Sequence, residues 1–218
     1  MLKYEYGNKN AENVLIQMVD DHDISEIPAE MERIREAAKD DFCLIALKVN
    51  NWNHDLSPWE APAVFGDEGF GGGAKETLDE VMKMTVETKK RYYIGGYSLA
   101  GLFALWTAYQ TNVFAGVAAA SPSIWFPGFI DYMKVNEILT DQVYLSLGDR
   151  EEKTRNPVMR TVGKCVRESC DLLTEKGVDC ILEWNKGNHF KDAGERTGKA
   201  FAWLLGGEKF ESKLSNLP

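Results

Sequence analysis

The sequence predicts an α/β domain in which helices cover both faces of a mostly parallel sheet. Short apolar runs alternate with helix-length amphipathic stretches along the whole chain, which is the pattern of repeated strand–helix–strand units. The run 42–49 is almost continuously apolar, as expected for a strand that is covered on both faces. A chain of 218 residues suits one domain and can bury a core without disulfides or metals. We therefore expect a single domain over residues 1–218.

The expected elements follow one another without a repeat, a linker or a low-complexity tract. Strands are expected over residues 14–19, 42–49, 91–94, 114–120, 143–147 and 180–184. Helices are expected over about 28–39, 74–89, 99–110, 156–176 and 195–205, where apolar residues recur at a spacing of three to four. The Trp-, Pro- and Gly-rich segment 50–73 predicts a long loop, and the polar segment from about 206 to 218 predicts a loose tail.

Composition and charge argue against several classes of protein. The chain has 25 Lys and Arg against 34 Asp and Glu, a formal net charge of −9, whereas binding to a nucleic-acid backbone needs clustered positive charge. No apolar run reaches the roughly 20 residues that a membrane-spanning helix requires, and residues 1–6 contain no apolar signal segment. We expect no nucleic-acid partner, no membrane association and a cytoplasmic location.

The sequence contains no pattern that favours a metal or a cofactor. The four cysteines are Cys43, Cys165, Cys170 and Cys180. They form neither the CxxC pairs of a zinc site nor the dense pattern of a disulfide scaffold, and structural thiols in a reducing compartment are the better interpretation. The acidic segment 20–23 lacks a metal-binding histidine spacing, and the glycine-rich segment 69–75 lacks the Gly-Lys-Ser/Thr of a phosphate-binding loop.

Residues with catalytic side chains gather directly after the expected strands. The segments concerned are 20–22, 50–55, 96–101, 121–125, 148–152 and 187–192. Because functional groups of open α/β sheets collect at the carboxyl ends of the strands, this clustering favours an enzyme.

Ser98 lies in a glycine-rich turn that follows a strand and opens a helix. The segment Gly95-Gly96-Tyr97-Ser98-Leu99-Ala100-Gly101 fits the G-x-S-x-G nucleophile turn, except that alanine replaces the last glycine. Small residues two before and two after the serine relieve the crowding of such a turn. The Ser98 hydroxyl would then stand above the sheet, with the Leu99 amide facing a developing oxyanion. The alternative is an ordinary serine N-cap.

A serine nucleophile needs a neighbouring base, and histidine is the usual one. The chain has three histidines, His22, His54 and His189. Only His189 follows both the serine and the last expected strand, which is where the base lies in this chain order. We therefore predict that His189 is the base rather than a solvated loop residue.

The orienting acid is expected after the strand 143–147. The segment Gly148-Asp149-Arg150-Glu151-Glu152 stands there, and a buried carboxylate in this place would hold the imidazole tautomer. Glu151 is the first choice because it lies three residues after the glycine. Asp149 and Glu152 remain alternatives.

Aromatic residues crowd the loops above the expected site. Tyr97, Trp52 and Trp125 are the candidate substrate-binding residues, although tryptophans also anchor loops and either role fits the pattern. Only the short segment 122–142 separates two expected strands. This leaves no room for a large cap domain, so we expect an open site.

At these residues the sequence resembles the esterase family of α/β-hydrolases, which includes enterochelin-type siderophore esterases, feruloyl esterases, formylglutathione hydrolases and mycolyltransferases. The resemblance extends over about residues 14–205. Its most specific part is the serine turn 96–101 followed by Ser121-Pro122-Ser123-Ile124-Trp125-Phe126. The segments 55–59, 148–151 and 187–189 add to it.

The resemblance implies an α/β-hydrolase fold and acyl-ester chemistry by a triad of Ser98, His189 and Glu151. It also places a second oxyanion amide at His22, beside that of Leu99. The family usually has glycine where this chain has Asp21, a departure that bears on the oxyanion site.

We therefore predict a serine esterase that acts on a small-molecule ester through an acyl-enzyme on Ser98, without a cofactor. An acyltransferase on the same triad and a non-catalytic binding module are the alternatives.

Overall fold

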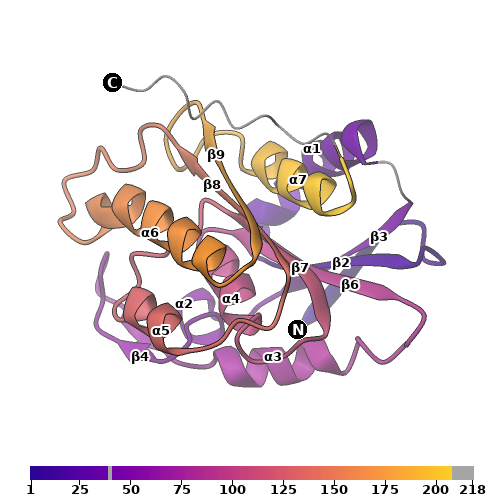
Figure 1. The fold of residues 1–218 in the computed structure, drawn as a ribbon, viewed down its shortest axis with the longest axis horizontal. Helices are drawn as coiled ribbons and strands as arrows, with labels where there is room; N and C mark the ends of the chain where they lie inside the picture. The colour runs from indigo at the N-terminus through magenta and orange to yellow at the C-terminus, as the bar shows by residue number, and fades with distance from the viewer. Residues whose placement is uncertain (39–40, 208–218) are drawn as a thin grey trace.

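The structure is a seven-stranded, mostly parallel sheet between two layers of helices (Figure 1). The computed structural model describes residues 1–38 and 41–207. The strands, in the order β1-β3-β2-β6-β7-β8-β9 across the sheet, are β1 (Leu2–Gly7), β3 (Phe42–Lys48), β2 (Asn13–Val19), β6 (Arg91–Tyr97), β7 (Phe114–Ala120), β8 (Gln142–Gly148) and β9 (Asp179–Asn185). Edge strand β1 pairs antiparallel with β3, and the remaining pairs are parallel. The predicted fold class is confirmed.

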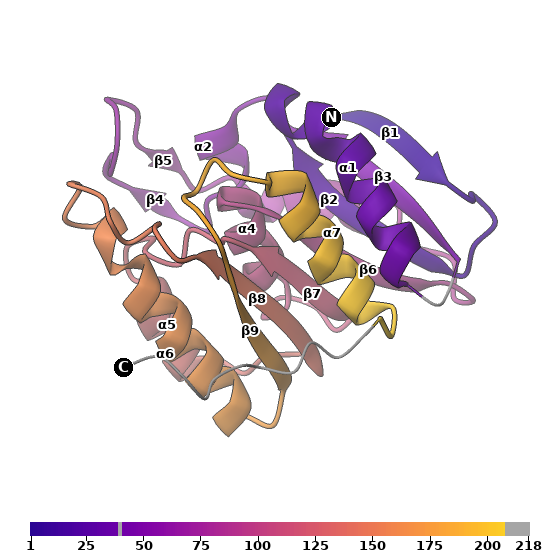
Figure 2. The ribbon, with the colours of Figure 1, turned by 90° about the horizontal axis from the view of Figure 1, so that it is seen from above.

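The two helical layers are unequal, as the view from above shows (Figure 2). One face of the sheet carries α1 (Asp21–Ala37) and α7 (Ala193–Leu204), and the other carries α3 (Ala74–Met82), α4 (Leu99–Thr107), α5 (Phe129–Val135) and α6 (Val162–Glu175). Short elements complete the described part of the chain: α2 (Trp52–Asp55), the ribbon of β4 (Glu60–Ala61) and β5 (Phe70–Gly71), and the 3₁₀ turn η1 (Met159–Thr161). Within the described ranges, no helix combines the length and apolar character that a membrane span requires.

The sheet has a hydrophobic core on each face, and successive side chains of each central strand pack alternately into one core and the other. On β2, Leu15 packs with the α1 and α7 side of the sheet, whereas Val14 and Ile16 pack with the α3 to α6 side. Side chains of a strand alternate between faces. The unbroken apolar runs of the sequence therefore reflect burial on both faces.

Strand β1 is absent from the sequence prediction because its pattern is that of an edge strand. All of its residues are exposed or partly exposed, and it carries Lys3 and Glu5, which form an ion pair of 2.8 Å. Charged side chains of this kind are typical of sheet edges.

Helix α1 begins seven residues before the predicted start at Pro28, which lies inside the helix. The acidic segment 20–23 contains its capping box: Asp20 Oδ1 accepts from the Asp23 amide at 2.8 Å, and Asp23 Oδ2 accepts from the Asp20 amide at 3.2 Å. Reciprocal capping satisfies two donors that a helix start otherwise leaves unpaired. The predicted end at Lys39 lies outside the described residues.

Three helices are shorter than predicted, of which α4 differs least, because it ends at Thr107 instead of about 110. Helix α3 ends at Met82 instead of about 89, and α6 begins at Val162 instead of about 156, after a turn in which Asn156 Oδ1 accepts from the amides of Val158 and Met159. Asn156 is a turn former by virtue of these bonds. Most of the predicted tail, residues 208–218, lies outside the described part of the chain.

Cysteines lie in or beside the core, and all four are free thiols. Cys43 is buried in β3. The Sγ atoms of Cys170 on α6 and Cys180 on β9 lie 3.6 Å apart. The two thiols therefore pack against each other between helix and sheet.

Helices α1 and α7 approach closely through two glycines one helical turn apart. A Cβ atom at Gly194 would lie 2.5 Å from the Glu26 carbonyl oxygen, and one at Gly198 would lie 2.8 Å from that of Glu30. Only glycine permits this approach. It places the start of α7 over the carboxyl ends of the strands.

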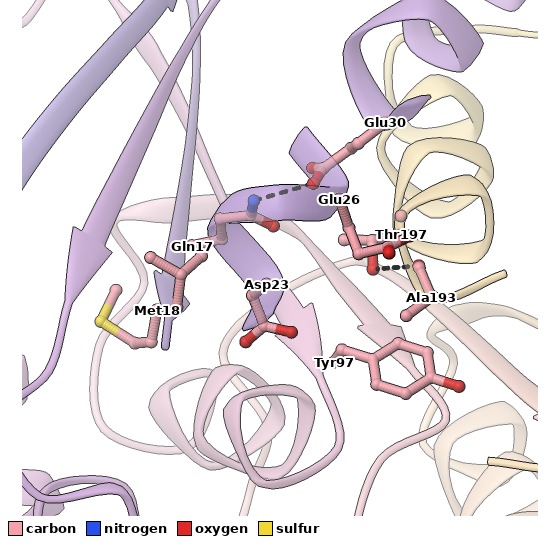
Figure 3. Close-up of a pocket in the computed structure, with 10 residues that line it drawn as sticks. Gln17, Met18, Asp23, Glu26, Glu30, Tyr97, Ala193 and Thr197 are labelled. Atoms are coloured by element: carbon pink, nitrogen blue, oxygen red, sulfur yellow. Dashed lines mark hydrogen bonds between the residues drawn. The ribbon is translucent and has the colours of Figure 1, made fainter. Parts of the chain in front are cut away.

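A small cavity between β2, α1 and α7 contains a buried carboxyl group (Figure 3). Glu30 is 2% exposed, and its Oε2 accepts from Gln17 Nε2 at 2.9 Å. Its Oε1 has no hydrogen-bond partner among the described residues. Burial raises the pKa of Glu30 to about 8, further raised by the charge of Asp23 and opposed by the Gln17 bond.

Glu30→Gln should stabilise the protein, with a gain that grows as the pH rises. The folded chain keeps a proton on Glu30 that the unfolded chain releases above its ordinary pKa of 4.5. The free energy of unfolding of the wild type therefore falls as the pH rises from 4.5 towards about 8. A neutral amide lacks this term, so we expect an added gain of about 3 kcal/mol between about pH 5 and pH 8, measured by urea unfolding.

Glu32→Gln is the matched control, because Glu32 lies on the exposed side of the same helix. Its stability difference from the wild type should not depend on pH in this range. An equal pH dependence for the two variants would contradict the assignment to Glu30.

Candidate active site

Three side chains from distant parts of the sequence meet at the carboxyl edge of the sheet. Ser98 follows β6, Glu151 follows β8 and His189 follows β9. His189 Nε2 lies 3.0 Å from Ser98 Oγ, and His189 Nδ1 lies 2.7 Å from Glu151 Oε2. The structure thus joins the hydroxyl, the imidazole and the carboxylate in one continuous hydrogen-bond chain.

The turn that carries Ser98 is a strained one. Ser98 has φ 57° and ψ −120°, a region that non-glycine residues occupy only where the surroundings enforce it. Gly96 has φ 157°, and a Cβ atom there would lie 2.6 Å from the Cβ of Ala100. The alanine fits in place of the usual glycine because Gly96 supplies the space. The same constraint makes Ser98 the N-cap of α4 without a side-chain cap bond, which leaves its hydroxyl for His189.

Glu151 is buried, and each of its oxygens has separate partners. Oε2 binds His189, whereas Oε1 accepts from the Gly148 amide at 2.7 Å, from Ser121 Oγ at 2.8 Å and from Arg196 Nη1 at 2.9 Å. Burial alone would raise the pKa of Glu151, but the bonds from His189, Gly148 and Ser121 outweigh it, and the pKa lies below its ordinary value. The carboxyl group is therefore ionised at neutral pH.

The other two candidate acids lie elsewhere. Asp149 Oδ1 accepts from the Gly187 amide at 2.8 Å, and this bond is the main cause of its lowered pKa. Glu152 pairs with Arg167 on α6 at 3.8 Å. Asp149 thus ties the β8 turn to the loop of His189, and of the three acids Glu151 is the one that reaches the imidazole.

Tyr97 and Arg196 fix the loop of His189 by hydrogen bonds to its backbone carbonyl oxygens. The Tyr97 hydroxyl donates to the His189 carbonyl oxygen at 2.8 Å, and Arg196 Nη2 donates to the Asn188 carbonyl oxygen at 3.0 Å. Burial raises the pKa of Tyr97 to about 12, so its hydroxyl stays protonated. Sequence reasoning missed Arg196. The available signal was a charged residue on the apolar face of the predicted helix 195–205, seven residues after the base.

The two amides predicted for the oxyanion site are both at helix starts. Leu99 is the first residue of α4, and His22 is the second residue of α1. Amides in the first turn of a helix have no intrahelical acceptor. His22 is exposed and does not line the pocket beside Ser98, so its assignment stays a prediction. The Asp21 carboxylate pairs with Lys48 at 2.5 Å, which offsets the negative charge that departs from the family pattern.

A pocket of about 330 Å³ opens beside Ser98 and His189. Its apolar lining consists of Phe65, Trp125, Met159, Val162 and Phe190. The pocket therefore offers an aromatic and aliphatic wall to whatever lies against the Ser98 hydroxyl.

The candidate substrate-binding residues divide between this pocket and other places. Trp125 lines the pocket, and Tyr97 lines the small cavity near Glu30 instead. Trp52 is half-buried in α2 and packs against the larger core. Trp59, on the same long loop as Trp52, anchors that loop: it donates to the Pro127 carbonyl oxygen at 3.0 Å and packs on Phe126. Of the predicted set, the structure brings only Trp125 to the pocket.

The glycine-rich loop lies directly against the ring of His54. A Cβ atom at Gly71 or Gly73 would lie within 2.5 Å of the His54 ring. His54 Nδ1 lies 3.0 Å from the neighbouring Asp55. The glycines therefore make room for one side of the His54 ring, whose side chain is otherwise 55% exposed. Over residues 1–38 and 41–207, no group of three acidic, histidine or cysteine side chains is placed to hold a metal ion.

No known protein-family model matches the chain. A curated relative, the uncharacterised protein YbbA of Bacillus subtilis (strain 168), is 24% identical over 186 residues, which cover 76% of this chain and 74% of YbbA.

Solved structures share the fold over almost the whole chain. An IroE-like serine hydrolase from Shewanella oneidensis has a TM-score of 0.72 at 13% identity, over 94% of this chain and 74% of its own. The siderophore hydrolase EstB from Aspergillus nidulans has a TM-score of 0.63 at 18% identity, over 90% of this chain and 83% of its own. The resemblance predicted from the motifs is thus matched at the level of the fold, which is that of α/β-hydrolases.

Proposed function

We propose that the chain is a serine esterase that hydrolyses carboxylic esters through an acyl-enzyme on Ser98. The observation that carries this proposal is the hydrogen-bond chain from Ser98 Oγ through His189 to an ionised Glu151. An ordinary N-cap serine has no need of a base at 3.0 Å or of strained backbone angles. The fold shared with serine and siderophore hydrolases supports the same reaction class.

In the proposed mechanism, Ser98 Oγ attacks the ester carbonyl while His189 Nε2 takes the hydroxyl proton. The Leu99 amide, at the positive end of α4, stabilises the oxyanion of the tetrahedral intermediate. The protonated imidazole then gives its proton to the leaving alkoxide, and the acyl group stays on Ser98. Water repeats the sequence and releases the acid. Glu151 holds the Nδ1 proton and stabilises the imidazolium throughout.

The pocket indicates the kind of acyl group that this site takes. Its five apolar lining residues include three aromatic rings, and none of the described lysines or arginines lines it. Such a wall stabilises uncharged apolar groups by removing them from water. We infer that the enzyme prefers neutral esters with an aliphatic or aromatic acyl group.

Ser98→Ala should abolish hydrolysis of p-nitrophenyl butyrate, by at least about 1,000-fold, because the acyl acceptor is lost. A fluorophosphonate probe should label the wild type on Ser98 and leave the variant unlabelled. Circular dichroism and urea unfolding check that the fold persists. Labelling of neither protein would favour the non-catalytic binding module. Product analysis with glycerol as a competing acceptor separates hydrolysis from acyl transfer.

Glu151→Gln should lower kcat by about 1,000-fold or more, since an amide cannot stabilise the imidazolium. Asp149→Asn is the matched control on the same turn. It weakens one bond to Gly187 and should cost far less. The opposite order of the two losses, measured as kcat/KM at neutral pH, would transfer the acid role to Asp149.

Met159→Trp should narrow the pocket and shift the preference towards short acyl groups. We expect the ratio of kcat/KM for p-nitrophenyl hexanoate to that for the acetate to fall by about tenfold, which corresponds to the burial of about two methylene groups. Val158→Trp is the control, because Val158 is the exposed neighbour and does not line the pocket. A similar shift in both variants would contradict the assignment of the pocket.

A further inference from the structure

Arg196 is a buried cation next to the proposed triad. It lies in the first turn of α7, is 1% exposed and is among the largest fully buried side chains of the described chain. A charge without a partner in such a place would be severely destabilising. Its counterion is Glu151, whose Oε1 lies 2.9 Å from Arg196 Nη1.

The guanidinium contacts every chain segment that carries a proposed catalytic residue. Nη1 donates to Glu151 and also lies 3.0 Å from the Tyr97 hydroxyl, directly before Ser98 in the chain. Nη2 donates to the carbonyl oxygen of Asn188, directly before His189. Nη1 further donates to Ser121 Oγ at 3.1 Å. A planar group with fixed donors thus sets the relative positions of three turns.

Arg196 does not line the pocket, so any effect on the reaction passes through Glu151 and the His189 loop. We propose that Arg196 is a positioning residue, which holds Glu151 by Oε1 so that Oε2 faces His189 and which limits the negative charge that the imidazole experiences. This inference rests on the proposed function, because it assigns Arg196 a part in the same proton transfers.

The charge of Arg196 should influence the protonation of the His189 imidazole, which an uncharged side chain of the same packing would not do. Glu151 favours the protonated imidazole, and a cation on the other oxygen of the same carboxylate opposes that effect. Removal of the cation should therefore let His189 keep its proton to higher pH. A base that stays protonated is inactive, so the acidic limb of the pH profile should move upward.

The other charged groups of the surrounding elements either bind other partners or line the cavity behind Tyr97. Lys191 and Asp192, on the same loop, pair with each other at 3.5 Å. Asp149 binds the Gly187 amide. From α1, Asp23, Glu26 and Glu30 line the cavity behind Tyr97 rather than the pocket of His189. Of the described charged groups, Arg196 is the one bonded to the carboxylate that holds the imidazole.

The test compares Arg196→Gln and Arg196→Lys with the wild type by pH profiles of kcat/KM for p-nitrophenyl butyrate. In Arg196→Gln we expect kcat to fall about 10- to 100-fold and the acidic limb to move up by about half a pH unit or more. Arg196→Lys keeps the positive charge but lacks the planar guanidinium with its two Nη donors. We therefore expect kcat to fall while the acidic limb of the pH profile stays near its wild-type position. Arg167→Gln, on the surface of α6, should change neither.

A fall in kcat without a shift of the limb in Arg196→Gln would overturn the proposal and leave a packing role only. If Arg196→Gln does not fold, Arg196→Lys decides the matter, since a wild-type kcat would contradict positioning by the guanidinium. Titration of the His189 ring by NMR gives a readout without substrate. A wild type that neither hydrolyses esters nor reacts with fluorophosphonate would refute the proposed function, and an upward shift of the ring titration in Arg196→Gln would still be expected.

Discussion

The site depends on one buried carboxylate whose two oxygens have different partners. Glu151 Oε1 accepts three hydrogen bonds from Gly148, Ser121 and Arg196, and this fixes the carboxylate plane. Oε2 is thereby directed at His189, and the imidazole in turn at Ser98. A buried carboxylate is stable in its ionised form only when hydrogen-bond donors of the protein replace the water molecules that it has lost. The geometry of the hydroxyl and the imidazole therefore follows from the environment of the acid.

The two buried glutamates of the described residues show how burial and the number of hydrogen-bond donors together set ionisation. Glu151 has four hydrogen-bond partners, one of them a guanidinium, and its pKa is lowered despite burial. Glu30 is more deeply buried, at 2% exposed against 9% for Glu151, and has one described donor, Gln17, so that burial raises its pKa to about 8. The first carboxyl group holds a charge that the proposed chemistry requires. Glu30 keeps its proton at neutral pH. It lies between α1 and α7, the two helices that cover one face of the sheet.

Sequence reasoning located the three central groups because strand ends and short motifs are local signals. A strand followed by Gly-x-Ser and a small residue specifies a turn, and three histidines leave few choices for a base. The contacts that lock the site in place are not local. Arg196 is 45 residues from Glu151 and 99 from Tyr97 in the chain, and no periodicity reveals such a meeting. The same reason explains why Tyr97 was expected in the pocket: its place before Ser98 is evident, but the direction of its hydroxyl is decided by α7.

In the proposed function, the side chains that would select the substrate come from other segments of the chain than the proposed triad, although both line one pocket. Ser98, Glu151 and His189 stand on turns at the ends of sheet strands, where the fold is shared with hydrolases of 13% and 18% identity. The apolar wall is built mainly from the loop before β5, from η1 and the start of α6, and from the exposed Phe190 after the base. Loops vary more readily than the strands they connect, so a common sheet edge does not imply a common substrate. In the proposed function, the aromatic rings of this wall, which has no lysine or arginine among its described lining residues, favour an apolar, uncharged acyl group over an anionic one.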